Sequence, residues 1–192
     1  MSNVSNRQIA ELALKIALGY ASAHVKEVGG PNRGDQVEFF QHTTGGGIGD
    51  SWCADFVYAC LLKSWSQSKG LLKTAAQEDS RRVMLAHSDE FSHETGIPRT
   101  GYCPTVAAKA KTAGRFHAKD FSPSPGELVL YDFHDQGEPH HIGFVVSRNA
   151  DGSLRTVEGN TGPGDGGSQG NGDGVYRRTR PRTHVYGFVS FE

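Results

Sequence analysis

The sequence is poor in cysteine, with only Cys53, Cys60 and Cys103 among its 192 residues. So small and odd a number does not fit a disulfide-stapled framework. No two of them form a C-x-x-C pair, which argues against a structural zinc site. Cys60 is expected to be a small buried apolar side chain, and a bridge between Cys60 and Cys103 stays open.

The chain also lacks an excess of charge of either sign, and it has no long apolar run. Its formal net charge is -1, with both signs mixed along the sequence, so no nucleic-acid partner is expected. No stretch reaches the roughly 18 apolar residues of a membrane span. Residues 1–7 are polar, and Glu11 and Lys15 interrupt the stretch that follows. We therefore expect no signal peptide and synthesis in the cytoplasm.

The first part of the chain has mainly helical patterns. Ser5 and Gln8 form a capping box, and apolar residues at helical spacing follow to about residue 25. Further helices are expected at 51–66, in 71–87, and from Pro104 to about Gly114. Residues 88–100 are expected to form a loop. The short segment 37–41 leads to Gly45-Gly46-Gly47, which is expected to be a flexible entry to the helix at 51–66.

After Pro123 the residue pattern changes from helical to strand-like. Five strand-like runs follow, at 127–133, 141–147, 153–158, 175–180 and 185–191. Asp151-Gly152 predicts a tight hairpin between the second and third. Helices first and strands afterwards indicate an α+β fold. We expect one domain over residues 1–192, with a helical part at 1–122, a β part at 123–192 and an antiparallel sheet of about five strands.

The stretch around Cys53 contains the first candidate catalytic residue. Asp50 or Ser51 is the expected helix cap, and Ser51 fits a thiolate better because an Asp50 carboxylate would oppose it. An apolar helical face follows the cysteine. Cys53 is therefore expected in the first turn of a helix. Free backbone N–H groups and the helix dipole stabilise a thiolate there. The pattern indicates a cysteine hydrolase.

A nucleophilic cysteine needs a base and a group that orients the base. His141 begins an apolar strand, so its ring is expected at the strand edge facing a cleft. Gly143 shares that face and would leave room for a substrate or for the cysteine helix. Glu158 and Asn160 share one face of the next strand. One could accept from the imidazole N–H, while the other steadies the ring or donates to an oxyanion.

Four motifs occur in order along the chain. They are Trp52-Cys53-Ala54-x-Phe56-Val57, Pro125-Gly126-Glu127-x-Val129-Leu130, His141-Ile142-Gly143-Phe144-Val145 and Glu158-Gly159-Asn160-Thr161. Together they resemble the successive motifs of the CHAP domain, the cysteine, histidine-dependent amidohydrolase/peptidase family. The resemblance covers about residues 25–191.

The resemblance implies a papain-like fold of the NlpC/P60-CHAP type, with N-terminal helices packed on the sheet. It implies that Cys53 is the nucleophile, that His141 is the base, and that Glu158 and Asn160 orient the histidine. The family mostly cleaves bacterial peptidoglycan, as an N-acetylmuramoyl-L-alanine amidase or as a stem or cross-bridge endopeptidase. The peptidoglycan partner is implied by the resemblance alone.

No cofactor is expected. Some members of the family bind calcium through a D-x-D run before the cysteine, but residues 43–50 contain no such pair. Calcium dependence is therefore not implied, although Asp165 and Asp173 in the glycine-rich segment 159–174 could ligate the ion weakly.

The same residues allow other interpretations. His134, His140 and His141, with nearby aspartates, have the side chains of a zinc site, so a metal-dependent hydrolase is one alternative. His140 is also the nearest rival to His141 as base and a candidate substrate contact. Trp52 could stack on substrate or be a buried aromatic. A non-catalytic wall-binding module on the same scaffold is the other alternative.

Two further expectations concern the arginine cluster and the setting. The arginines at 177, 178, 180 and 182 could attract anionic wall polymers, but the solvated face of an edge strand is preferred. Action in the periplasm or cell wall would follow release by a holin, as for a phage endolysin, or by a secretion system. An effector would add an immunity protein as partner, and a monomer is the default expectation.

Overall fold

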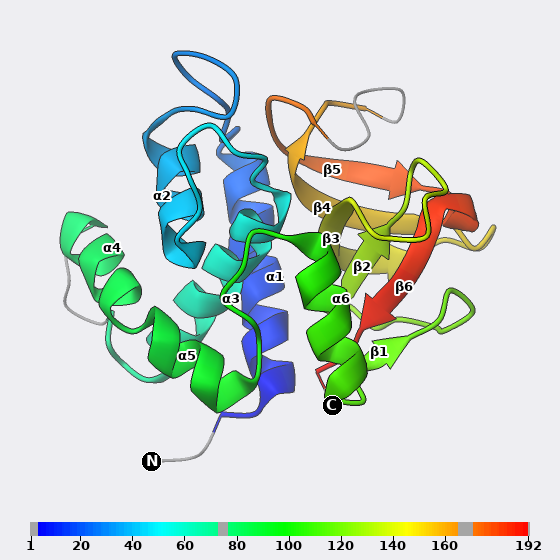
Figure 1. Cartoon of the computed structure of the whole chain (residues 1–192), viewed down its shortest axis with the longest axis horizontal. Helices are drawn as coiled ribbons and strands as arrows, with labels where there is room; N and C mark the ends of the chain where they lie inside the picture. Colours follow the sequence, from blue (N-terminus) through cyan, green and yellow to red (C-terminus); the bar gives the residue numbers. More distant parts are fainter. Residues whose placement is uncertain (1–3, 73–76, 165–170, 192) are drawn as a thin grey trace.

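The computed structural model describes residues 4–72, 77–164 and 171–191. Figure 1 shows α1 to α5 gathered beside a curved sheet, with α6 running next to β1. The helices are α1 (Asn6–Ser22), α2 (Asp35–Thr44), α3 (Cys53–Ser68), α4 (Gln77–Ala86), α5 (Ser88–Thr95) and α6 (Cys103–Thr112). None of these described helices is long and apolar enough to cross a membrane.

The strands form one antiparallel sheet in the order β1-β6-β2-β3-β4-β5. Their bounds are β1 (Phe116–His117), β2 (Leu128–Tyr131), β3 (His141–Arg148), β4 (Leu154–Thr161), β5 (Gly174–Arg180) and β6 (Val185–Val189). The α+β class and the papain-like arrangement are confirmed. Within the described residues the sheet has six strands rather than about five. The additional strand is the two-residue β1, which lies in the part expected to be helical and pairs with β6.

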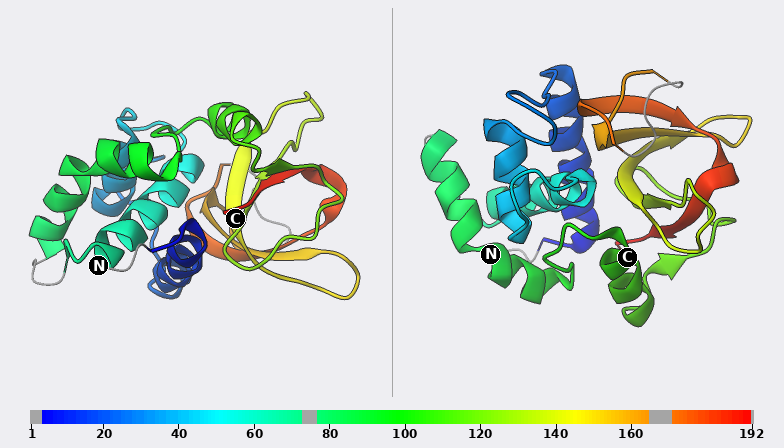
Figure 2. Two further views of the ribbon diagram at one scale, coloured as in Figure 1. Left: turned by 90° about the horizontal axis from the view of Figure 1, so that it is seen from below. Right: turned by 45° about the horizontal axis from the view of Figure 1, so that its top comes forward.

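The two faces of the sheet have different roles. Leu130, Ile142 and Phe144 belong to the main core beneath the helices. Tyr131 and Val145, which alternate with them along the strands, belong to a second cluster on the opposite face. Figure 2 shows that the sheet is strongly curved. Side chains of β3 and β4 can therefore be buried on both faces.

Helix α3 is the centre of the helical layer. It packs against α1, α2, β3 and β4, and is buried on nearly all sides. An aromatic cluster surrounds its first turn: Phe56 makes edge-to-face contacts with Phe40, Trp52 and Phe144. This cluster holds the amino end of α3 against the sheet, where Cys53 lies.

Two helices were not expected. Helix α2 replaces the short piece at 37–41 and ends at Gly45, whose φ of 82° makes it a left-handed cap rather than part of a flexible entry. Helix α5 replaces a predicted loop. Its sequence is mostly polar, and Phe91 attaches it to the core by packing against Tyr58 and Trp65.

Candidate active site

Cys53 is the first residue of α3, and Trp52 is the residue that caps the helix, without a side-chain cap. The expectation that Asp50 or Ser51 caps the helix is therefore wrong. The Trp52 indole N–H donates to Glu27 Oε1 at 3.0 Å, and its ring stacks on Phe40. Because Trp52 is fully buried, its ring has no free face for a substrate, which corrects the stacking interpretation.

Gly159 of β4 allows α3 to approach the sheet this closely. A Cβ at this position would lie 2.7 Å from Phe56 Cβ and 2.8 Å from the ring of Trp52. Only a glycine fits there without displacing the aromatic cluster. The small residue between Glu158 and Asn160 thus sets the distance between the cysteine helix and strand β4.

His141 is the first residue of β3, and its ring is fully buried. Its Nε2 atom forms a 2.9 Å hydrogen bond with Glu158 Oε2. A Cβ on Gly143 would lie 2.5 Å from Glu158 Cγ. The space at Gly143 is therefore taken by Glu158 and not by a substrate or by the cysteine helix, as had been expected.

Glu158 is a buried carboxylate with several donors. Besides the His141 ring, Arg180 donates from Nε to Oε1 at 3.0 Å and from Nη2 to Oε2, and the Thr156 hydroxyl donates to Oε1. Burial by itself would raise the pKa of Glu158, but the hydrogen bonds from His141 and Arg180 outweigh it and lower the pKa to about 2. The residue is therefore ionised at neutral pH.

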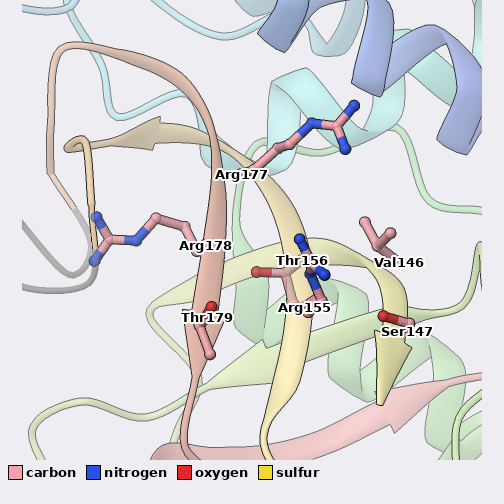
Figure 3. Close-up of a pocket in the computed structure, with 7 residues that line it drawn as sticks. All are labelled: Val146, Ser147, Arg155, Thr156, Arg177, Arg178 and Thr179. Atoms are coloured by element: carbon pink, nitrogen blue, oxygen red, sulfur yellow. The ribbon is translucent and has the colours of Figure 1, made fainter. Parts of the chain in front are cut away.

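The arginines of the cluster lie in two different environments. This corrects the interpretation of the cluster as a solvated face. Arg178 and Arg180 are buried, whereas Arg177 is exposed. Figure 3 shows Arg177 and Arg178 leaving β5 in opposite directions beside a groove of about 370 Å³, which Arg155 also lines. The Arg180 guanidinium lies over the rings of Tyr131 and Phe133, at 5.6 and 5.1 Å. It belongs to the site, and its alternation with Arg177 and Thr179 was the signal for it in the sequence.

The second nitrogen of the His141 ring, Nδ1, is buried and has no hydrogen-bond partner among the residues that the structure describes. The Cys53 thiol interacts with this ring. Burial would lower the pKa of His141, but the interactions with Cys53 and Glu158 raise it to about 9. A protonated His141 beside Cys53 is the arrangement that holds a cysteine as thiolate.

Cys103, which the sequence left without a role, lies beside the candidate nucleophile. The Sγ atoms of Cys53 and Cys103 are 3.8 Å apart. A hydrogen bond from the Cys103 thiol lowers the pKa of Cys53 well below its usual range; burial opposes this, and His141 adds to it. The bridge between Cys60 and Cys103 left open above is absent, since all three described cysteines are free.

Asn160 does not point to the histidine. In the amide orientation that satisfies both neighbours, its oxygen accepts from the Trp52 N–H at 3.1 Å and its nitrogen donates to Gly172 O at 3.0 Å. Its φ of 55° interrupts the regular alternation of β4. Among the described contacts, Glu158 thus holds the histidine, while Asn160 holds the backbone next to Cys53.

Of the histidines expected as alternative metal ligands, His134 and His140 lie together, with their ring centroids 5.2 Å apart, but His141 is not part of that pair. His141 bonds Glu158, whereas His140 bonds Gln136 and lies 3.5 Å from Asp132. The Asp132 carboxylate accepts from the backbone N–H groups of the turn at 134–137. No group of three metal-binding side chains exists among the residues that the structure describes. This hairpin is an aspartate-capped turn rather than a metal site.

Of the other residues considered, His140 contributes its backbone oxygen, 3.9 Å from Cys53 Sγ. Asp173, one of the two carboxylates considered for calcium, pairs with Lys26 at 3.5 Å and accepts from the Tyr176 hydroxyl at 2.7 Å. Asp165, the other, lies outside the described residues.

The chain is similar to a known protein family. The family model described as CHAP domain matches residues 43–160. The matched segment runs from the end of α2 to β4 and includes Cys53, His141, Glu158 and Asn160. No curated protein and no solved structure matches the chain.

Proposed function

Because the chain belongs to the CHAP domain family, we propose that it hydrolyses an amide bond of peptidoglycan with Cys53 as the nucleophile. The family is one of cysteine, histidine-dependent amidohydrolases and peptidases that act on peptidoglycan. The observation that supports the proposal most strongly is the buried series of Cys53, His141 and Glu158, in which His141 bonds Glu158 at 2.9 Å and Cys53 helps to raise the pKa of His141. That series contains a nucleophile, a base and an orienting carboxylate.

In the proposed reaction, the Cys53 thiolate attacks the carbonyl carbon of the scissile amide. His141, protonated at the start, gives its proton to the departing amine. The acyl group stays on Cys53 as a thioester, and the neutral His141 then takes a proton from the attacking water. Hydrolysis of the thioester releases the carboxylic acid and restores the thiolate–imidazolium pair.

The developing oxyanion would lie at the amino end of α3, where the backbone N–H of Cys53 can donate to it. Glu158 keeps the ring nitrogen Nε2 protonated, which leaves Nδ1 for the thiol and the amine. Asn160 holds the backbone of Trp52, and we propose that it sets the direction of this first turn.

Digestion of purified sacculi tests the proposal. The wild type should release soluble wall fragments, and Cys53→Ala should release none above background. Cys60→Ala is the matched control, because it removes a buried thiol of the same helix outside the site. Release of fragments by Cys53→Ala at the wild-type rate would refute the nucleophile assignment. If a chelator then abolished that release, the result would point to metal-dependent hydrolysis.

Mass spectrometry of the released fragments identifies the bond that is cleaved. Free stem peptides that begin with L-alanine would identify an N-acetylmuramoyl-L-alanine amidase. Muropeptides with stems cut internally would identify an endopeptidase. Sacculus binding without cleavage by the wild type would identify a wall-binding module.

A further inference from the structure

Two cysteines from separate helices meet in this site. Cys53 is the first residue of α3 and Cys103 the first residue of α6, so both lie where a helix dipole is positive. Their sulfur atoms are 3.8 Å apart, within the range of a hydrogen bond between two sulfurs. Helix α6 therefore contributes a second thiol to the site, at the end that is uppermost in Figure 1.

We propose that Cys53 and Cys103 are an oxidant-reactive dithiol, which a peroxide closes into an intramolecular disulfide that masks the nucleophile. The formation of the disulfide depends only on the two thiols. The accompanying loss of wall hydrolysis rests on the function proposed above.

The environments of the two sulfurs suit the two parts of such a reaction. Cys53 is the thiolate of the pair, because the hydrogen bond from Cys103 and the neighbouring His141 favour its charged form. A thiolate is the form of cysteine that peroxides oxidise. Cys103 is kept as a thiol, because its contact with Cys53 and its burial both raise its pKa. It is therefore the partner that resolves the oxidised sulfur.

The reaction balances with one peroxide. Cys53 Sγ attacks a peroxide oxygen, the O–O bond breaks, and the hydroxide that leaves takes a proton from His141 to form water. The product is a sulfenic acid on Cys53. Cys103 Sγ then attacks Cys53 Sγ, the S–O bond breaks, and the hydroxyl leaves as water with the thiol proton of Cys103. Hydrogen peroxide is reduced to two waters, and the two sulfurs are oxidised to a disulfide.

The geometry requires only a small movement. A disulfide bond is about 2.05 Å long, so the sulfurs must approach by about 1.8 Å. Both side chains are 3% exposed, which admits a small oxidant more readily than a second protein molecule. Tyr102, next to Cys103, is 59% exposed, so the pair lies beneath the surface and not in the deep core. An intramolecular bond is thus favoured over a bond between chains.

Cys60 supplies an internal control. It is fully buried, and burial raises the pKa of its thiol. It should stay reduced while the other two cysteines react. Its removal also simplifies the measurement, because the tryptic peptide 34–63 contains both Cys53 and Cys60, whereas the peptide 100–109 contains Cys103.

The test uses the full-length Cys60→Ala protein treated with hydrogen peroxide, blocked with iodoacetamide and digested without reductant. We expect a cross-linked species of peptides 34–63 and 100–109, two hydrogen atoms lighter than their sum, which dithiothreitol separates. The matched variant Cys103→Ala should form no such bond and should accumulate sulfinic acid on Cys53, which dithiothreitol does not reverse. Uncrosslinked peptides from peroxide-treated Cys60→Ala, or a bond only between two chains, would overturn the proposal.

A second measurement links the disulfide to activity. Peroxide-inactivated wild type should regain at least half of its sacculus hydrolysis with dithiothreitol, and Cys103→Ala should regain much less. If the disulfide forms but the untreated protein never cleaves sacculi, the function fails while the dithiol stands. If the untreated protein cleaves sacculi but no disulfide forms, the dithiol fails while the function stands.

Discussion

The guanidinium of Arg180 binds the carboxylate of Glu158 through two nitrogens, Nε to Oε1 at 3.0 Å and Nη2 to Oε2. The same Oε2 atom bonds the ring of His141. A buried positive charge on β5 thus keeps the carboxylate on β4 ionised, and that carboxylate orients the histidine on β3. Neutralising any one of these three side chains therefore changes the electrostatic environment of the other two.

Replacing Arg180 by glutamine should therefore affect both stability and the pH profile. Glu158 would keep its burial but lose its main cation, at a cost of about 3 kcal/mol in the free energy of unfolding. Its pKa, now about 2, would rise, so the acid limb of sacculus hydrolysis should move to higher pH. Urea unfolding and the pH profile measure the two effects.

The matched control is Arg177→Gln on the same strand. Arg177 is exposed, so the free energy of unfolding should change by less than about 0.5 kcal/mol and the pH profile should stay as in the wild type. An Arg180→Gln protein with an unmoved acid limb would show that Arg180 does not act through Glu158.

Asn160 offers a test of how the first turn of α3 is held. Asn160→Gly should remove the bond to the Trp52 N–H and keep the φ of 55° without strain. We expect about 1–2 kcal/mol of lost stability and slower alkylation of Cys53. Asn160→Ala should cost roughly 1 kcal/mol more, since alanine resists a left-handed backbone. Unchanged Cys53 alkylation in Asn160→Gly would contradict the positioning role.

Gly143 should not tolerate a side chain. A Cβ there would lie 2.5 Å from Glu158 Cγ, so Gly143→Ala should push the carboxylate away from His141 and reduce hydrolysis at least about tenfold. Gly19→Ala is the control, because nothing lies within 4 Å of a Cβ on that helical glycine. It should leave hydrolysis intact and raise stability by roughly 0.5–1 kcal/mol. Full activity in Gly143→Ala would contradict the contact.

The pH dependence of Cys53 alkylation follows from the signs of two shifts. The pKa of Cys53 is lowered well below its usual range, and that of His141 is raised to about 9. The thiolate–imidazolium pair is thus present between the lowered pKa of Cys53 and a pH of about 9. The alkylation rate at pH 6 should be within a few fold of that at pH 8, whereas a free cysteine slows about 80-fold over this interval.

His141→Ala is the informative variant for this measurement. Without the imidazolium, the alkylation rate should depend more steeply on pH than in the wild type, although the hydrogen bond from Cys103 still lowers the pKa of Cys53. A rate in the wild type that depends as steeply on pH as that of a free cysteine would contradict the ion pair.

The sequence predicted the parts of the site that depend on local pattern. The first turn of a helix at Cys53 and the strand start at His141 follow from periodicity and from the residues that precede them. The α+β order follows from the change in pattern after Pro123. These features require no knowledge of which distant residues meet.

Features that depend on long-range contacts were missed. Cys103 lies fifty positions after Cys53, and only the packing of α6 brings the two sulfurs together. Arg180 was interpreted as a solvated charge, because a single strand does not reveal that its partner is a buried glutamate. Asn160 was expected to face the histidine by simple alternation, which the irregular register between Glu158 and Thr161 disrupts.

The most direct test of the account compares the alkylated fraction of Cys53 with the remaining sacculus hydrolysis, in a Cys60→Ala protein titrated with iodoacetamide at pH 6. Mass spectrometry of peptide 34–63 gives the alkylated fraction. We predict that hydrolysis falls in direct proportion to this fraction and reaches background when Cys53 is fully modified. Hydrolysis that persists on a fully alkylated Cys53 would contradict its role as the nucleophile.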